Sequence, residues 1–139
     1  MPYGPQVLWP DHALQDSTNA ALHGDFDTAR MEVIVRKGFD PDIDSYSVFF
    51  ENDHQTRTGL DGWLRSRGVR RLYLAGLATD FCVAWSAEDA IRLGFEVTVI
   101  EDACRGIGLP VSAGWTTLDE AKKRLSMMGV RFVTSDTLV

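Results

Sequence analysis

Residues 71–100 read RLYLAGLATDFCVAWSAEDAIRLGFEVTVI, and this stretch decides the fold. Two parts of it, Arg71–Leu77 and Phe95–Ile100, have the composition of buried strands. Between them, from Cys82 to Leu93, apolar residues recur at helical spacing, and Gly94 follows as a stop signal. A strand, a helix and a strand in this order predict a right-handed βαβ unit with parallel strands. The helical residues expected to face inward are Val83, Ala87, Ala90 and Ile91.

The segments on either side of this unit continue the alternation of strands and helices. Leu60–Arg67 is amphipathic and Gly68 follows it, which predicts a helix with a glycine C-cap. Thr116–Met128 predicts another helix, and Arg131–Thr134 predicts a final strand. This alternation predicts the α/β class, with three α/β/α layers around a mainly parallel sheet. We expect residues 1–139 to form a single domain.

The N-terminal part of the chain is richer in turn-forming residues. The stretch up to Gly24 predicts a loop or short turns, because it is rich in Pro, Gly, Asn, Asp and Ser. Met31–Arg36 is rich in β-branched residues and predicts a short buried strand, which Lys37-Gly38 ends. Phe39–Thr58 predicts a long loop with one or two helical turns, and loops of that length are often functional.

Composition and charge narrow the class of function. Of the 139 residues, 45% are hydrophobic and 24% are charged, as in ordinary globular proteins. The net charge of −6 argues against nucleic acid and an anionic membrane surface as partners. We expect a cytoplasmic protein, because no apolar run approaches the roughly 18 residues of a membrane span and the N-terminus lacks signal-peptide features. Cys82 and Cys104 are then expected to be thiols, and neither has a close Cys or His partner for a zinc site.

Cys82 stands where the strand gives way to the helix. Backbone N–H groups at a helix N-terminus stabilise a thiolate and can donate to an oxyanion. The edge at which parallel strands end is also where α/β proteins bind ligands. Position alone leaves two interpretations of Cys82 open, a nucleophile and a small buried core residue. Asp80 is interpreted as a helix N-cap, which is compatible with a functional role.

Three other positions carry side chains suited to chemistry. Lys37 ends the first predicted strand, so its ammonium would favour a thiolate at Cys82 if the two strand ends are close; the alternative is an exposed lysine. The face of Trp9 suits an aromatic ring, and His12 could bind a metal or donate a hydrogen bond, although a lone histidine usually does neither. Cys104 is expected to be structural.

Taken together, these features resemble the nicotinamidase/pyrazinamidase branch of the isochorismatase-like hydrolases. Order and spacing agree over residues 5–107, and after Leu109 the resemblance is only architectural. The block GLATDFCV is specific, and the pattern WPDH-x-x-Q gives independent support. The matching segments are Leu8–His12, Arg36–Gly38, Asp44–Phe50, Gly76–Val83 and Asp102–Gly106.

The resemblance implies a cysteine hydrolase acting in NAD salvage. Cys82 would attack the carboxamide of nicotinamide or pyrazinamide, release ammonia and form a thioester that water hydrolyses. Lys37 would be the catalytic lysine. Ala78 and Cys82 would donate backbone N–H groups to the oxyanion, with a cis peptide at Leu77–Ala78.

The resemblance also implies a pocket for an aromatic ring. Trp9 would flank the pyridine ring, and Tyr46 would line the same pocket. His12 would be one ligand of a divalent metal, with zinc as the expected ion. The implied partner is therefore a small-molecule amide, and a homo-oligomer is left open.

Some parts of the family pattern do not occur in this sequence. The family begins with a strand that carries an aspartate base, and a second strand ends in D-x-H, yet neither pattern occurs before Trp9. We therefore expect an N-terminally incomplete domain with impaired activity, in which the chain alone does not hold the metal. One alternative is a non-catalytic remnant or a binding domain that a partner completes. Another is a family member acting on an isochorismate or carbamoyl substrate, against which Trp9–His12 argues.

Overall fold

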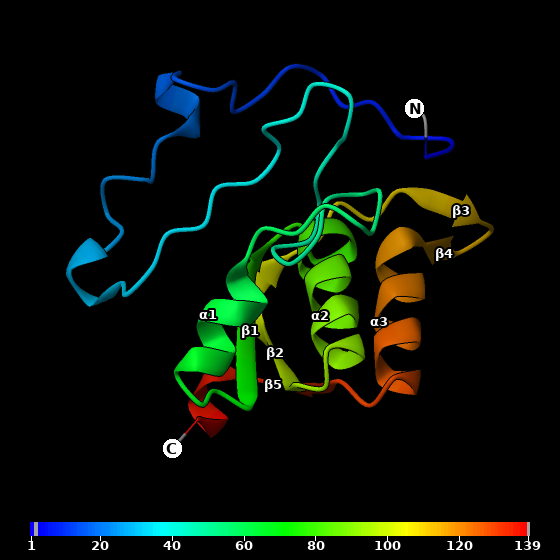
Figure 1. Ribbon diagram of the computed structural model, residues 1–139. Coiled ribbons are helices and arrows are strands. Elements are labelled where there is room, and N and C mark those ends of the chain that lie inside the picture. The colour runs from blue at the N-terminus through cyan, green and yellow to red at the C-terminus, as the bar shows by residue number, and fades with distance from the viewer. Residues whose placement is uncertain (2, 139) are drawn as a thin grey trace.

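The computed structural model describes residues 1 and 3–138 and shows an α/β fold. Its main sheet has three parallel strands in the order β1-β2-β5 (Figure 1). These strands are β1 (Arg71–Leu77), β2 (Glu96–Arg105) and β5 (Arg131–Val133). The α/β class and the mainly parallel sheet are thus confirmed, together with the three strands predicted after residue 70.

Helices α2 (Ala84–Arg92) and α3 (Thr117–Met127) lie side by side and join the three strands (Figure 1). Ala87 and Ala90 are fully buried, as the helical spacing predicts, because small residues let α2 approach the sheet closely. The helix α3 begins with a capping box in which Thr116 and Asp119 exchange side-chain and backbone hydrogen bonds.

Helix α1 (Leu60–Ser66) packs at the junction of α2 and β2, and its predicted apolar face is confirmed. Leu64 is buried, and Leu60 and Trp63 pack against the same core. The Arg65 guanidinium donates to the carbonyl of Leu93 and lies 5.2 Å above the ring of Phe95. The single hydrophobic core therefore includes all three helices and the sheet.

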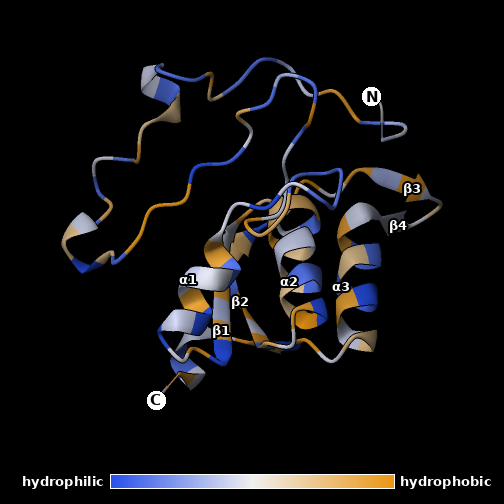
Figure 2. Cartoon of the chain, in the orientation of Figure 1, coloured by the Kyte–Doolittle hydropathy of each residue, from blue (hydrophilic) through white to orange (hydrophobic). Residues whose placement is uncertain are grey.

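The predicted strand Met31–Arg36 is wrong. This segment pairs with no strand among the described residues, and Figure 2 shows it as a partly hydrophobic coil outside the main sheet. Val33 and Ile34 are 41% and 51% exposed. A strand requires a hydrogen-bonding neighbour, which a run of β-branched residues cannot supply by itself. Upstream lie two short 3₁₀ turns, η1 (Thr18–Ala20) and η2 (Thr28–Arg30), in agreement with the predicted turns.

The predicted helical turns in Phe39–Thr58 do not form, although the long loop does. Polar side chains in this loop take up backbone N–H groups: Asn52 Oδ1 accepts from Tyr46, and Ser47 Oγ accepts from Phe49. Such side-chain acceptors compete with helical hydrogen bonds, which explains the difference. The buried residues Ser47 and Phe49 anchor the loop in the molecule.

A small antiparallel hairpin, β3 (Pro110–Ser112) and β4 (Trp115–Thr116), was not predicted. Its strands are too short to show an alternating pattern. Gly114, with a φ of +73°, lies in the turn between β3 and β4, and β4 leads into α3. The hairpin therefore fixes the start of α3 next to the carboxyl edge of the sheet (Figure 1).

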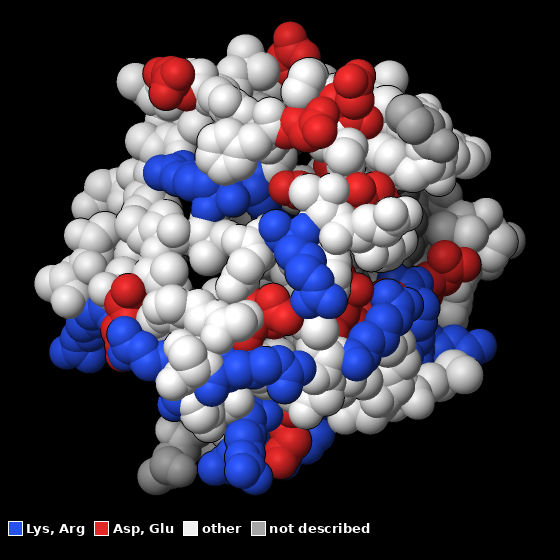
Figure 3. Space-filling view, in the orientation of Figure 1, with Lys and Arg blue, Asp and Glu red and all other residues white. Residues whose placement is uncertain are grey.

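The surface shown in Figure 3 carries both signs of charge. Lys and Arg side chains are interspersed with Asp and Glu over its lower part, whereas acidic side chains predominate at the top. Among the described residues, no helix is sufficiently long and apolar to cross a membrane.

Candidate active site

Cys82 lies in a single π-helical turn, η3 (Thr79–Val83), at the carboxyl end of β1. The Val83 N–H donates to the carbonyl of Ala78, five residues earlier, at 3.1 Å. The peptide bond between Leu77 and Ala78 is cis. Cys82 is partly exposed rather than enclosed in the core, so its thiol is accessible for chemistry.

Lys37 and Cys82 meet although 45 residues separate them in the sequence. Lys37 Nζ lies 3.9 Å from Cys82 Sγ and donates to the carbonyl oxygen of Ser45 at 2.5 Å. The carbonyl dipole holds the ammonium in place. The structure therefore places the Cys82 thiol beside a cation.

A pocket of about 470 Å³ surrounds this pair. All the site residues predicted from the sequence line it, although their roles remain predictions. The predicted residues in its wall are Trp9, His12, Lys37, Tyr46, Leu77, Ala78 and Cys82. The sequence did not indicate that Asp44, Ser45, Phe81 and Ile107 also line it. Asp44, Ser45 and Phe81 lie within the matching segments Asp44–Phe50 and Gly76–Val83, which was a usable signal, whereas Ile107 comes from a different loop.

Aromatic side chains build one wall of the pocket. The rings of Trp9 and Phe81 meet edge to face, with centroids 5.0 Å apart, and Tyr46 packs against Phe81 at 5.6 Å. The Trp9 indole N–H donates to the Tyr46 hydroxyl at 2.9 Å. Burial raises the pKa of the Tyr46 phenol, so this hydroxyl stays neutral near pH 7. Such a wall suits a flat aromatic ligand.

Asp80 ties the turn that carries Cys82 to the rest of the molecule, so the predicted N-cap is wrong. Its buried carboxylate accepts hydrogen bonds from Ile107 N (2.9 Å), Gly108 N (2.8 Å) and the Thr117 hydroxyl (2.5 Å). Burial acts to raise the pKa of Asp80, but these hydrogen bonds together lower it below its ordinary value. The ionised carboxylate therefore clamps three chain segments together.

Ser86 makes a second link to the Cys82 turn. Its buried hydroxyl donates to the carbonyl of Cys82 at 2.6 Å and accepts from Val48 N at 3.0 Å. The hydroxyl thus joins helix α2 to the loop that contains Tyr46. The Ser86 side chain therefore links this loop to the turn that carries Cys82.

Replacing Ser86 by Ala should lower the free energy of unfolding by about 1–2 kcal/mol, because two buried groups lose their partner. Urea unfolding followed by circular dichroism measures the change. Ser126→Ala is the matched control, because Ser126 is an exposed serine within helix α3. An equal loss in both variants would contradict the role assigned to the Ser86 hydroxyl.

His12 lines the pocket, and its Nδ1 lies 2.7 Å from the carbonyl oxygen of Pro10. Within residues 1 and 3–138, the structure contains no cluster of three or more His, Cys, Asp or Glu side chains that could hold a metal ion. A catalytic metal needs about three protein ligands. The described residues therefore do not fit a divalent metal, and His12 is only one potential ligand.

Cys104 is buried near the end of β2 and does not line the pocket. Burial raises the pKa of its thiol, which disfavours the reactive thiolate. The Gly76 backbone contributes a hydrogen bond to it. These observations agree with the structural role predicted for Cys104 and distinguish it from Cys82.

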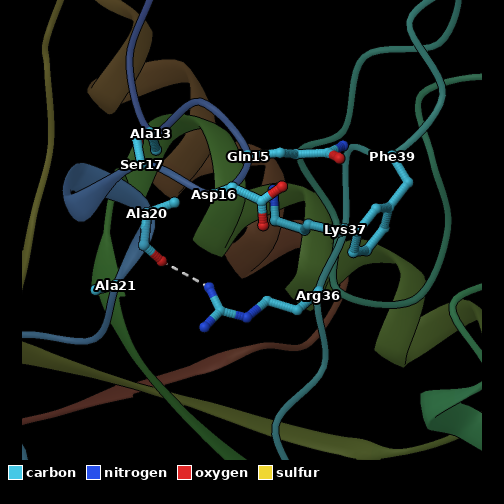
Figure 4. Close-up of a pocket in the computed structure, with 9 residues that line it drawn as sticks. All are labelled: Ala13, Gln15, Asp16, Ser17, Ala20, Ala21, Arg36, Lys37 and Phe39. Atoms are coloured by element: carbon cyan, nitrogen blue, oxygen red, sulfur yellow. Dashed lines mark hydrogen bonds between the residues drawn. The ribbon is translucent and has the colours of Figure 1, made fainter.

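A second pocket, of about 390 Å³, lies between residues 13–21 and 36–39 (Figure 4). Arg36 crosses it and donates to the carbonyl of Ala20 at 2.6 Å. Lys37 lines both pockets, so the two adjoin. Unlike the pocket around Cys82, this second pocket has no cysteine among its lining residues.

Comparison with known proteins identifies the family. Residues 2–128 match the isochorismatase domain. This chain belongs to the isochorismatase family. It is 45% identical over 139 residues to a nicotinamidase of Acinetobacter baylyi, covering 100% of this chain and 63% of the relative. It is 44% identical over 105 residues to the nicotinamidase of Escherichia coli, and the match covers 76% of this chain and 49% of that relative.

Solved structures of family members share the fold. The nicotinamidase/pyrazinamidase of Acinetobacter baumanii superposes with a TM-score of 0.92 at 45% identity, covering 100% of this chain and 65% of that one. PnC1 from L. infantum, in complex with nicotinate, has a TM-score of 0.86 at 37% identity, and the match covers 95% of this chain and 63% of that one. The pyrazinamidase of Pyrococcus horikoshii, in complex with zinc, has a TM-score of 0.74 at 31% identity, and the match covers 91% of this chain and 63% of that one. The isochorismatase-like chain thus spans about half to two thirds of the length of these relatives.

Proposed function

We propose that this isochorismatase-family chain carries the catalytic cysteine and lysine of an amidohydrolase that converts nicotinamide to nicotinate and ammonia. Pyrazinamide would be a second substrate. The observation that carries the proposal is the 3.9 Å approach of Lys37 Nζ to Cys82 Sγ in a pocket with an aromatic wall. Relatives named nicotinamidase support the choice of substrate.

In the proposed reaction the Cys82 thiolate attacks the carboxamide carbon, and the carbonyl electron pair moves onto oxygen. The N–H groups of Ala78 and Cys82 would donate to that oxyanion. When the oxyanion collapses, the C–N bond breaks and the nitrogen leaves as ammonia after taking a proton from solvent. Water then attacks the thioester carbon, the C–S bond breaks, and the acid and the free thiol are released.

Residues of this chain would divide the supporting roles. Lys37 would stabilise the thiolate and the developing negative charge. Trp9 would flank the pyridine ring, and Tyr46 would line the same pocket. The product nicotinate is a precursor for NAD, so we assign the reaction to NAD salvage in the cytoplasm.

We further propose that the 139-residue chain turns over slowly by itself. Among the described residues, the hydrogen-bond partner found for Cys82 Sγ is Lys37 Nζ, a cation that cannot take the thiol proton. The aspartate base of the family pattern does not occur before Trp9. No step of the mechanism is assigned to a metal, because the described residues do not fit one.

Ammonia release from nicotinamide tests this proposal. The chain should release ammonia slowly but above the uncatalysed rate, and a polypeptide extended by the family's aspartate strand should be faster. Ureidoacrylate is the control substrate, because a ureidoacrylate amidohydrolase of Agrobacterium fabrum is 40% identical over 63 residues. A preference for ureidoacrylate would contradict the proposal. Binding of nicotinamide without any turnover by either polypeptide would instead support a non-catalytic binding domain.

A further inference from the structure

Gln6 lies where two segments far apart in the sequence cross. Its Nε2 donates to the Tyr46 hydroxyl and to Asp44 Oδ2, both at 3.0 Å. Its Oε1 accepts from Asn52 Nδ2 at 3.0 Å. Gln6 thus bonds to three side chains that are 38 to 46 residues away in the sequence. One amide therefore joins the N-terminal segment to the long loop.

These contacts form a closed ring of hydrogen bonds. Asn52 Oδ1 accepts from the Tyr46 backbone N–H at 2.8 Å, while the Asn52 amide donates to Gln6. Gln6 then returns to Tyr46 through its hydroxyl. Asn52 is 5% exposed and Tyr46 is 7% exposed, whereas Gln6 is half-buried, so the bonds of Gln6 are partly shielded from solvent. A closed ring of this kind holds its members in one arrangement.

The ring of hydrogen bonds connects directly to the aromatic wall of the pocket. The Tyr46 hydroxyl accepts from both Gln6 and the Trp9 indole, so it is the shared point between them. Trp9 meets the edge of Phe81, the residue next to Cys82. Trp9 and Tyr46 line the pocket, whereas Gln6 does not. An effect of Gln6 on a ligand can therefore pass through the aromatic wall or through Asp44, which accepts from Gln6 and also lines the pocket.

We propose that Gln6 is a positioning residue that sets the orientation of Trp9 through the Tyr46 hydroxyl and thereby sets the affinity for the aromatic amide. The identity of that amide rests on the proposed function. Gln6 touches neither the nucleophile nor the pocket lumen, so its loss weakens ring binding rather than the chemical step.

The first test reads the Trp9 indole without any ligand. In Gln6→Leu, the ¹H–¹⁵N resonance of the Trp9 indole, assigned with Trp9→Phe, should shift, because the Tyr46 hydroxyl loses one of its two donors. The indole resonances of Trp63 and Trp115 report that the fold is intact. Gln55→Leu is the matched control, because Gln55 is exposed in the same loop as Tyr46. An unshifted Trp9 resonance in a folded Gln6→Leu protein overturns the proposal.

The second test separates positioning from stability. Gln6→Leu should raise the KM for nicotinamide about tenfold with kcat within about twofold, the effect of one hydrogen bond. In a Tyr46→Phe background the same change should alter KM less than about twofold, since the shared hydroxyl is gone. An undiminished effect in that background overturns the proposal.

A second variant and the activity of the unaltered chain separate failure of the Gln6 proposal from failure of the proposed function. Gln6→Glu keeps an acceptor for Asn52 but loses the donor to Tyr46, so it should shift the Trp9 resonance even if Gln6→Leu does not fold. Absence of nicotinamide turnover in the unaltered chain would contradict the proposed function. The role of Gln6 would then be tested by the Trp9 indole resonance alone, because that measurement requires no substrate.

Discussion

Replacing Cys82 by Ala should reduce ammonia release from nicotinamide by about a thousandfold or more, because the covalent route requires the sulfur nucleophile. The pocket should survive this change. Cys82 is only partly buried, and its neighbours Asp80 and Ser86 hold the turn through hydrogen bonds that do not involve the thiol. Steady-state ammonia release by both proteins at saturating nicotinamide measures the effect.

Cys104→Ala is the matched control for this experiment. It removes the other free thiol, which is buried and outside the pocket, so activity should stay within about twofold of the unaltered protein. Thermal unfolding of all three proteins shows whether any loss of activity reflects loss of folded protein. Undiminished ammonia release by Cys82→Ala would rule out the thioester mechanism.

Replacing Asp80 by Ala should lower the free energy of unfolding by about 3–5 kcal/mol, because three hydrogen-bond donors lose a buried ionised acceptor. Those donors belong to Ile107, Gly108 and Thr117. A single domain is usually stable by only about 5–15 kcal/mol, so this is a large fraction of the total. The loop at residues 106–108 should also loosen, which would widen the pocket at Ile107.

The free energy of unfolding that Asp80→Ala loses should depend on pH. The pKa of Asp80 is lowered in the folded protein, so its contribution is fully present above the ordinary carboxyl pKa of about 4. It disappears as the pH falls through the lowered value. The difference between the unaltered protein and Asp80→Ala should therefore be largest at neutral pH and smaller at pH values well below 4.

Urea unfolding at several pH values measures this difference. Asp42→Ala is the control, because Asp42 is an exposed aspartate in the long loop. It should change the free energy of unfolding by less than about 0.5 kcal/mol at any pH. Equal losses for the two aspartates would show that the hydrogen bonds of Asp80 contribute little.

Local patterns predicted the three helices α1, α2 and α3 and the three strands of the main sheet, but not the β3–β4 hairpin. Helix α2 with its buried Ala87 and Ala90, and the strands β1 and β2, follow from side-chain periodicity and glycine stops. Two predictions whose outcome depended on a distant partner were wrong. Met31–Arg36 has the composition of a strand but no described neighbour to pair with, and Asp80 bonds to residues 27 to 37 positions away instead of capping its own helix.

The sequence by itself determined the α/β alternation, the position of Cys82 at a strand-to-helix turn and the family resemblance. These depend on residues near one another in the chain, whose order directly sets periodicity and turns. Only the tertiary structure decided that Lys37 meets Cys82, that Asp80 clamps the loop at residues 106–108, and that Gln6 lies behind the aromatic wall. Each of these contacts joins segments more than 25 residues apart, and no spacing rule specifies where such segments cross.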